Sequence, residues 1–227
     1  TLSVMGDAGP AVRAGLARAL GLDDPGHGWH TDRSGLAQLA GWAAGIAGSL
    51  GKRGEDLVLA SQSGIGEIRI DGAGGSSTMP QKQNPVGPSA LVALGRQVIG
   101  LSAVMQGAAM HRQARDGASW FTEWLTLPQL CISTGRMLGL ALDLAGCLVP
   151  DPAAMARAID DGTGLIHAEA LSFALAVRMP RPEAQALVKA LCREAEVTGT
   201  NLAALAARDF PGTDWVGLLS RQSLGPA

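Results

Sequence analysis

Residues Gly74–Pro85, with the sequence GGSSTMPQKQNP, join two apolar segments of helical period and hold most of the recognisable chemistry of the chain. The two glycines give the backbone conformations that other residues cannot adopt, so a mobile loop can carry the hydroxyls of Ser76 and Ser77. Lys82 adds a positive charge close by. Together these groups favour the binding of a carboxylate, although Gly, Ser, Pro and Asn are also the residues of any surface turn.

The end of this segment predicts a helix start. Asn84 is expected as the N-cap of the next helix, with Pro85 at its first helical position. A helix that begins there directs free N–H groups and a partial positive charge toward the loop. Hydroxyls, an ammonium and a helix N-terminus would then converge on one place.

A family resemblance rests on the same stretch. Residues Gly75–Pro85 resemble the signature loop of the fumarase/aspartase superfamily, written G-S-S-x-M-P-x-K-x-N-P, at every fixed position. The resemblance implies an all-α fold, in which a bundle of long helices is followed by a small C-terminal helical domain. It also implies a homotetramer with shared active sites, a small di- or tricarboxylate substrate, and neither a cofactor nor a metal.

The resemblance also implies roles for the loop residues. Members of the superfamily form or break a C–N or C–O bond beta to a carboxylate, through an aci-carboxylate carbanion. Ser76 is implied to move the proton at carbon with the help of Lys82, so these are the expected catalytic residues. A serine hydroxyl is a poor base by itself and needs N–H groups and a cation to stabilise its alkoxide. Ser77, Thr78 and Asn84 are implied to bind substrate carboxylates.

One position departs from the lyases of the superfamily. Those enzymes carry a glutamate seven residues after the loop lysine, which polarises a histidine, and this chain has Ser89 there. A leaving amine or water needs proton transfer on its side of the bond, whereas a carboxylate that closes a lactone does not. The chain therefore resembles the branch that closes carboxylated muconates into lactones, in which Ser76 would be the general acid. The alternatives are an adenylosuccinate- or argininosuccinate-type lyase and an inactive helical scaffold.

Residues 29–33, WHTDR, form a polar cluster at the start of a helix that is expected to run to about Ile65. Thr31 or Asp32 can serve as its N-cap, which leaves Arg33 solvated. Alternatively, Thr31 and Arg33 bind a substrate carboxylate, as a similar T-x-R-D segment in one branch of the superfamily implies. The sequence supports the two interpretations about equally.

A further candidate lies in the turn between two long helical segments. Residues 111–120, HRQARDGASW, resemble the H-E-R-D-type turn of the superfamily, with Ala114 in place of the glutamate. The resemblance makes Arg115 the cation that faces the substrate. The alternative is a charged turn between helices. Trp120 and Trp124, spaced i,i+4, are expected in the core.

Apolar residues at three- and four-residue steps predict a bundle of long helices. The longest, residues 119–148, is expected to span about 45 Å and to kink at Pro128. Residues 67–71 alternate in polarity, but a plain connector is favoured over a strand. Helices are expected at residues 10–20, 32–65, 85–112 and 119–148, and the face that the last one buries is expected to comprise Trp120, Trp124, Leu127, Cys131, Thr134, Leu138 and Ala141.

Prolines mark the expected domain boundary. The segment Pro150–Pro152 separates a bundle domain, residues 1–149, from a small helical domain, residues 150–227. The last residues of the chain are expected to fray. The small domain is expected to contain helices at residues 153–178, 182–196 and 201–207.

Composition excludes several classes of function. A net charge of -2 and a pI near 6.0 give no electrostatic case for nucleic acid or an anionic membrane surface. The three cysteines lie in apolar helical patterns, so they are expected to be reduced core residues of a cytoplasmic protein. Charged residues interrupt the apolar stretches, so no membrane span is expected.

Helices that are apolar nearly all round must be covered by other helices in a soluble protein. A chain of 227 residues cannot easily cover all of them by itself, which predicts an oligomer. The sequence begins at Thr1 and lacks the earlier segments of the family. Two interpretations follow: the chain is part of a longer enzyme, or each of its sites lacks a wall and the product is inactive or weakly active.

Overall fold

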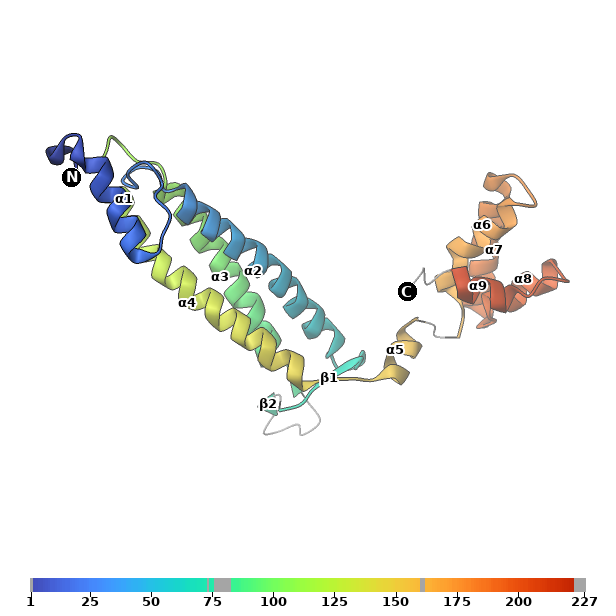
Figure 1. Cartoon of the computed structure of the whole chain (residues 1–227). Helices are drawn as coiled ribbons and strands as arrows, with labels where there is room; N and C mark the ends of the chain where they lie inside the picture. Colours follow the sequence, from blue (N-terminus) through green and yellow to red (C-terminus); the bar gives the residue numbers. More distant parts are fainter. Residues whose placement is uncertain (1, 73, 76–82, 160–161, 223–227) are drawn as a thin grey trace. The chain divides into compact units, whose positions relative to one another are not determined.

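The computed structural model describes residues 2–72, 74–75, 83–159 and 162–222 (Figure 1). Nearly all regular structure within these ranges is helical, which confirms the all-α prediction. The chain divides into two compact units, Thr1–Leu59 with Ile70–Leu148, and Ala60–Arg69 with Val149–Ala227. In chain order the elements are η1 (Leu2–Met5), α1 (Ala8–Leu20), α2 (Ser34–Ala60), β1 (Ile68–Ile70), β2 (Gly74–Gly75), β3 (Gln83–Asn84), α3 (Val86–Ala108), α4 (Gly117–Cys147), β4 (Leu148–Pro150), α5 (Pro152–Ile159), η2 (Leu165–His167), α6 (Ala168–Ala176), α7 (Arg181–Thr198), α8 (Leu202–Asp209) and α9 (Trp215–Gln222).

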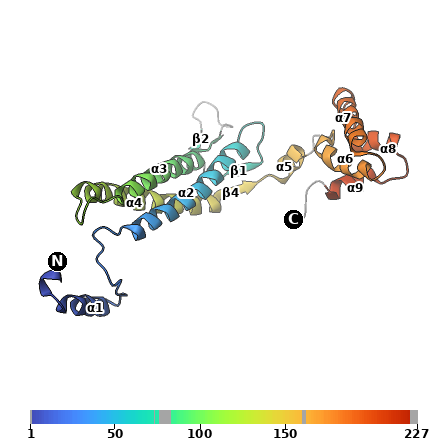
Figure 2. The same ribbon diagram turned by 90° about the horizontal axis from the view of Figure 1, so that it is seen from above.

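Helices α2, α3 and α4 lie side by side in the first unit (Figures 1 and 2). The approach of α2 to α3 depends on missing side chains: a Cβ atom at Gly54 would lie 2.9 Å from the carbonyl oxygen of Pro88. A Cβ atom at Gly95 would lie 3.0 Å from the carbonyl oxygen of Ala47. Glycine at these two positions therefore lets the helices pack at close range. The buried apolar residues of the three helices are Ala40, Ala43, Ala47, Leu57, Leu91, Val98, Met105, Ala108, Leu130, Met137, Leu140 and Leu144.

The buried face of α4 differs from the expected one. Of the seven residues expected there only Thr134 is buried, while Trp124, Cys131 and Leu138 are exposed. The helix is apolar nearly all round, so periodicity alone could not identify the stripe that packs inside the chain. For the same reason the expectation that Cys131 is a core residue is wrong. The stripe that does pack inside comprises Ser119, Glu123, Thr126, Leu130, Ser133, Thr134, Met137, Leu140 and Leu144.

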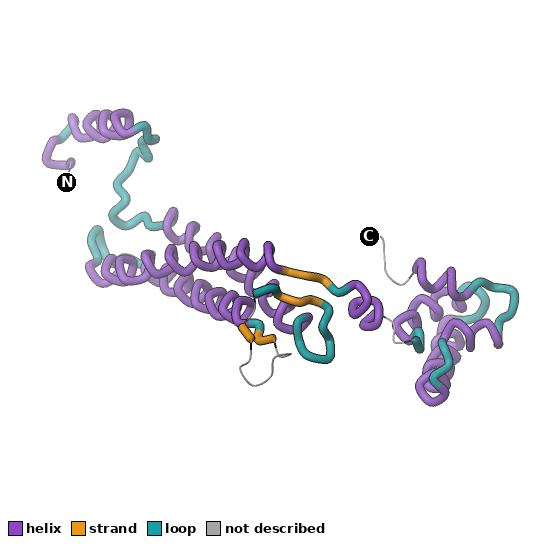
Figure 3. Tube along the Cα trace, turned by 90° about the horizontal axis from the view of Figure 1, so that it is seen from below, coloured by secondary structure: helices purple, strands orange, loops and turns teal. Residues whose placement is uncertain are grey.

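Helix α2 ends earlier than expected, at Ala60 instead of about Ile65. Gly64 and Gly66 follow it with φ angles of 95° and 63°, which a continuing α-helix cannot adopt. The chain then enters β1, which pairs with β4 in a two-stranded sheet (Figure 3). The expectation of a plain connector over residues 67–71 is therefore wrong.

Two helices of the described part of the chain, α3 and α4, are long and apolar enough to cross a membrane by length and composition alone. The sequence-based expectation of no such stretch is not met on that criterion. The core helices of a soluble bundle satisfy the same criterion. Because α3 and α4 pack extensively against each other, we interpret both as bundle helices.

The second unit has its own core, formed by α6 to α9. Residues 153–178, expected to form one helix, are instead divided into α5, η2 and α6. Gly162 and Gly164 take positive φ angles of 100° and 70°, which a helix running through them could not adopt. Helix α6 packs against α7, which follows it after a short turn.

The expectation that the last residues of the chain fray is wrong for residues 216–222, which belong to α9. Trp215, at the start of this helix, is almost fully buried. Its indole N–H donates a hydrogen bond to the carbonyl oxygen of Phe210 at 2.9 Å. A buried tryptophan with its polar group satisfied contributes a large apolar area, and it anchors α9 to the core of the unit.

Candidate functional site

The signature segment lies where β2 and β3 meet the start of α3. The two strands pair antiparallel, with Gly74 opposite Asn84, so the two ends of the segment are held next to each other. A loop closed in this way starts and finishes at one place, directly before a helix N-terminus. The central part of the segment lies outside the described residues, so the expected roles of Ser76, Ser77, Thr78 and Lys82 stay predictions.

The start of α3 corrects one expectation. Asn84 belongs to β3 and does not cap the helix, because Pro85 occupies the N-cap position with a ψ angle of 61°. The N–H of Ser89 donates the first helical hydrogen bond to the Pro85 carbonyl oxygen at 3.0 Å. A residue before proline is biased toward extended conformations, and Asn84 uses that conformation to pair with Gly74. The partial positive charge of the helix start still follows the loop directly.

A pocket of about 350 Å³ lies beside this helix start. None of the described residues that line it is Lys or Arg, and Asp71 contributes a carboxylate. An apolar hollow with a carboxylate does not attract a carboxylate ligand. A ligand of that charge would therefore depend on cations from elsewhere, such as Lys82. The lining residues are Ile70, Asp71, Gly72, Pro85, Val86, Gly87, Pro88, Leu144 and Cys147.

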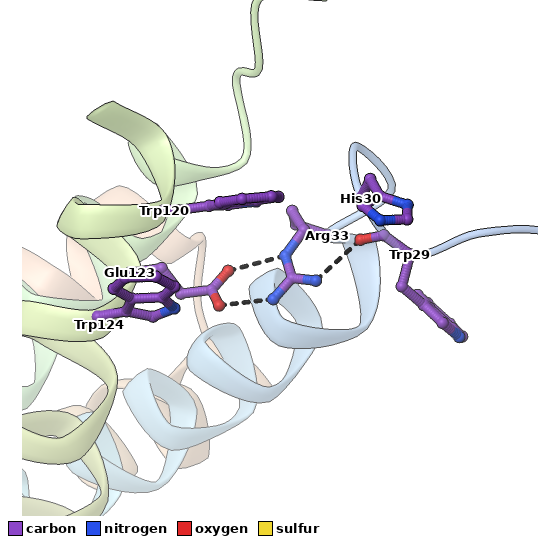
Figure 4. Close-up of a pocket in the computed structure, with 6 residues that line it drawn as sticks. All are labelled: Trp29, His30, Arg33, Trp120, Glu123 and Trp124. Carbon is purple, nitrogen blue, oxygen red and sulfur yellow. Dashed lines mark hydrogen bonds and ion pairs between the residues drawn. The ribbon is translucent and has the colours of Figure 1, made fainter. Parts of the chain in front are cut away.

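A second pocket, of about 290 Å³, lies at the other end of α4, where the segment before α2 meets its first turns (Figure 4). Arg33 and Glu123 form a bidentate ion pair there: Nε lies 2.8 Å from Oε2 and Nη2 lies 2.5 Å from Oε1. Nη1 of Arg33 donates to the Trp29 carbonyl oxygen at 2.9 Å. The expectation of a solvated Arg33 is therefore wrong, because the buried carboxylate of Glu123 holds it. The pocket is lined by Trp29, His30, Arg33, Trp120, Glu123 and Trp124.

Trp120 and Trp124 form a wall of this pocket instead of a part of the core. Their rings stack with centroids 6.3 Å apart, and the ring of His30 lies 6.4 Å from that of Trp120. Trp124 is 59% exposed. The expectation of core positions is wrong, because i,i+4 spacing places two residues on one face of a helix without showing what covers that face.

Asp32 provides the side-chain cap of α2. Its Oδ1 accepts hydrogen bonds from the Ser34 hydroxyl at 2.6 Å and from the Ser34 N–H at 3.1 Å. These bonds lower the pKa of Asp32 from its ordinary value, and the bond from the Ser34 hydroxyl has the larger effect. The first helical hydrogen bond ends on the Arg33 carbonyl oxygen, so the N-cap position itself falls one residue after the expected Asp32. Thr31 is exposed to solvent.

Arg115 lies in the turn between α3 and α4. Its side chain is exposed and makes no hydrogen bond or ion pair with any residue that the structure describes. Asp116 holds the turn, since it accepts hydrogen bonds from the Arg112 guanidinium and from the Ala118 N–H, both at 3.0 Å. Hydrogen bonds from Arg112 keep the pKa of Asp116 well below its usual range. The bond from the Arg112 side chain has the largest effect, and the bond from its backbone N–H has the next largest. Arg115 is thus an available cation on a turn of fixed shape.

Comparison with known proteins identifies the family. Residues 10–100 match a family model described as Lyase. A 3-carboxy-cis,cis-muconate cycloisomerase from Pseudomonas aeruginosa is 40% identical over 198 residues, which cover 86% of this chain and 43% of that protein. The crystal structure of 3-carboxy-cis,cis-muconate lactonizing enzyme from Pseudomonas putida superposes with a TM-score of 0.85 at 34% identity, covering 99% of this chain and 52% of that one. The chain belongs to the fumarase/aspartase superfamily.

A third relative agrees with this assignment. The 3-carboxy-cis,cis-muconate cycloisomerase of Bradyrhizobium diazoefficiens is 37% identical over 212 residues, which cover 92% of this chain and 47% of that protein. The chain spans about half the length of the curated relatives it matches. Membership of the fumarase/aspartase superfamily confirms the resemblance that the signature loop carries, together with the all-α fold.

The described residues around the candidate site lie at the two ends of helix α3. Helix α3 has 23 residues and spans about 34 Å. The signature segment precedes its first residue, whereas Arg115 follows its last turn. The start of α2, near Arg33, lies at that far end too, because the Gln106 side chain donates to the Ala37 carbonyl oxygen at 2.8 Å.

Sequence reasoning missed Glu123. It is the buried partner of Arg33, and the two are 90 residues apart in the chain. A signal was present, because a single glutamate on an otherwise apolar helix is rarely buried unless it is paired. Spacing alone could not name the partner, since the bond depends on how α2 and α4 pack.

Proposed function

We propose that this protein is a cycloisomerase that converts 3-carboxy-cis,cis-muconate to 4-carboxymuconolactone, an intramolecular lyase of the fumarase/aspartase superfamily. The observation that carries the proposal is the 36–40% identity to three relatives that bear the name 3-carboxy-cis,cis-muconate cycloisomerase. Ser89 supports it, because the glutamate of the lyases is missing at that position. In this role the protein acts in protocatechuate degradation, the β-ketoadipate route of aromatic catabolism, in the cytoplasm.

In the proposed reaction one substrate carboxylate attacks a carbon of the diene and forms the C–O bond of the lactone. The electron pair of that double bond moves toward the neighbouring carboxylate, which becomes an aci-carboxylate. Ser76, as general acid, then donates its proton to the adjacent carbon. Lys82 and the N-terminus of α3 stabilise the negative charge that develops on the carboxylate and then on the serine oxygen.

The substrate carries three carboxylates, so the site needs several donors of hydrogen bonds and several cations. Ser77, Thr78 and Asn84 are proposed to hold the carboxylates nearest the reacting carbon. Arg115 suits a more distant carboxylate, because its guanidinium is exposed and has no partner among the described residues. Arg33 and Thr31 are proposed to contribute from the neighbouring segment before α2.

We infer that complete sites form only between copies, as in a homotetramer. Strands β2 and β3, which flank the loop, lie about 34 Å along α3 from the Arg33–Arg115 end of the same copy, so a second copy is proposed to supply one part of each site. The exposed surface of the bundle supports this arrangement. Large apolar side chains such as Trp42, Leu125, Ile132 and Leu142 are all more than half exposed.

The test is an ultraviolet assay for the loss of the muconate diene, with the gene product that contains this sequence and with its Ser76→Ala variant. The wild type is expected to remove the diene absorbance, and the variant is expected to lose about 10³-fold or more in kcat, because the proton donor is gone. Ser63→Ala is the matched control, since Ser63 is an exposed serine in the turn after α2.

Two outcomes would count against the proposal. A wild type that leaves 3-carboxymuconate unchanged but cleaves adenylosuccinate or argininosuccinate would make the protein a lyase. A wild type that acts on none of these substrates would favour an inactive helical scaffold.

A further inference from the structure

Glu123 has an environment that is unusual for a glutamate. It lies in the second turn of α4 and is 5% exposed, while both of its carboxylate oxygens accept from Arg33. A buried carboxylate is stable only when it is paired and hydrogen-bonded, so Glu123 and Arg33 depend on each other. The other ion pairs between described residues of α2, α3 and α4, such as Arg96 with Glu55, lie on exposed surface.

The pair fixes the orientation of the Arg33 guanidinium. Nε and Nη2 bind the two oxygens of Glu123, and Nη1 binds the Trp29 carbonyl oxygen (Figure 4). A guanidinium is planar, so three bonds in its plane leave it one orientation. Each terminal nitrogen carries a second N–H, and these remain for a further acceptor.

The surroundings of the guanidinium suit a conjugated carboxylate. The pocket of about 290 Å³ has walls of Trp29, Trp120 and Trp124, which offer flat apolar faces for a planar chain. Apolar walls also strengthen a hydrogen bond between the guanidinium and a carboxylate, because they exclude water. A lysine at position 33 would supply charge, but it would not supply two parallel N–H bonds.

We propose that Glu123 is a positioning residue that acts through Arg33, and that the remaining N–H groups of Arg33 bind a carboxylate of the substrate. The inference rests on the proposed function, and it adds a residue from α4 that the signature motif does not contain. Glu123 itself does not touch the substrate. Its effect is therefore expected in the KM and in substrate affinity, with little effect on the chemical step.

The test compares Glu123→Gln, Glu123→Asp and Arg33→Lys in the same gene product, with Glu55→Gln as the control for loss of an exposed pair. Glu123→Gln and Arg33→Lys are each expected to raise the KM for 3-carboxymuconate about tenfold while kcat changes less than threefold. The double variant is expected to be no worse than either single variant, because both changes remove the same interaction. Glu123→Asp is expected to restore part of the affinity, and Glu55→Gln is expected to change neither constant.

Circular dichroism and thermal melts accompany the kinetics, since loss of a buried ion-pair partner also lowers stability. A folded Glu123→Gln protein with an unchanged KM would overturn the inference and leave the proposed function intact. If Glu123→Gln does not fold, Arg33→Lys decides, and an unchanged KM there overturns it equally.

Tryptophan fluorescence titration with the same substrate separates this inference from the proposed function. If the wild type binds 3-carboxymuconate without converting it, the proposed function is refuted. Tenfold weaker binding by Glu123→Gln would then still support the role of Glu123. A wild type that does not bind the substrate overturns the inference together with the proposed function.

Discussion

The two ends of the α3–α4 pair are held by different kinds of interaction. At one end, a glycine-rich segment returns to its starting point through the pairing of Gly74 with Asn84, directly before a helix start. At the other end, a buried glutamate and the Trp29 carbonyl oxygen hold an arginine in one orientation, beside a pocket lined by three tryptophans. The first end depends on what the backbone can adopt, and the second depends on how side chains pack.

This difference explains why the loop end is visible in the sequence as one motif, whereas the pairing of Arg33 with Glu123 at the other end is not. The backbone conformation of a turn constrains residues that are adjacent in the sequence, so it produces a contiguous motif of Gly, Ser and Pro. Side-chain packing constrains residues that can be far apart in the sequence, such as Arg33 and Glu123. The proposed site needs both ends, and the following predictions test what each end contributes.

The largest effect is expected at the loop end. Lys82→Met should lower kcat about 10²–10³-fold in the diene assay, because the cation that stabilises the developing charge is removed. Lys52→Met is the control, since Lys52 is an exposed lysine paired with Asp56 on α2. Equal activities of the two variants would place the catalytic cation elsewhere and remove the contrast between the ends.

The sequence predicted the helices, the all-α fold and the family well, because each leaves a local pattern. The ends of α1 and α4 fall within two residues of their expected positions. The errors arose where a long-range contact decides the result. The strand β1 needs β4 as its partner, and Asn84 is extended because Gly74 lies opposite it. Likewise, the stripe of α4 that packs inside could not be chosen without knowing where α3 lies.

The residues of the candidate site also differ in whether a local pattern or a long-range contact identifies them. The motif nominated Ser76, Ser77, Thr78, Lys82 and Asn84 from one stretch. It gave Arg33 two interpretations, and the structure adds a third, in which the arginine is already held by Glu123. No local pattern could have joined those two residues, because the contact is created by the packing of α2 against the bundle.

The next effect tests whether the bundle keeps the two ends apart as a rigid spacer. Gly54→Ala should destabilise the protein by about 1–3 kcal/mol, because the new methyl group would lie 2.9 Å from the Pro88 carbonyl oxygen. Gly100→Ala on α3 should instead stabilise it by about 0.5–1 kcal/mol, since a Cβ atom there meets nothing within 4 Å. Thermal or denaturant unfolding measures both, and the same sign for the two variants would refute the close contact of α2 with α3.

A smaller effect is expected at the turn that carries Arg115. Asp116→Ala should cost about 1 kcal/mol, since the α4 N-cap is lost, whereas Asp116→Asn should retain most of the capping. The folded-state pKa of Asp116 is lowered, so its contribution is complete well above the ordinary aspartate pKa. The advantage of the wild type over Asp116→Ala should therefore stay constant from pH 8 to 5 and shrink as the pH falls below about 4. An advantage that grows on acidification would contradict the assigned hydrogen bonds.

The smallest effect separates the buried ion pair from an exposed one in the same bundle. Arg96 and Glu55 lie 2.9 Å apart between α3 and α2, and their side chains are 76% and 49% exposed. Exposed pairs gain little because solvent screens the attraction, so Arg96→Gln should change the unfolding free energy by less than about 0.5 kcal/mol. The change should vanish in about 1 M salt, where the screening length falls to about 3 Å. A loss as large as that of Glu123→Gln would mean that burial does not distinguish the two pairs, and the special position of Glu123 at the tryptophan-lined end would lose its physical basis.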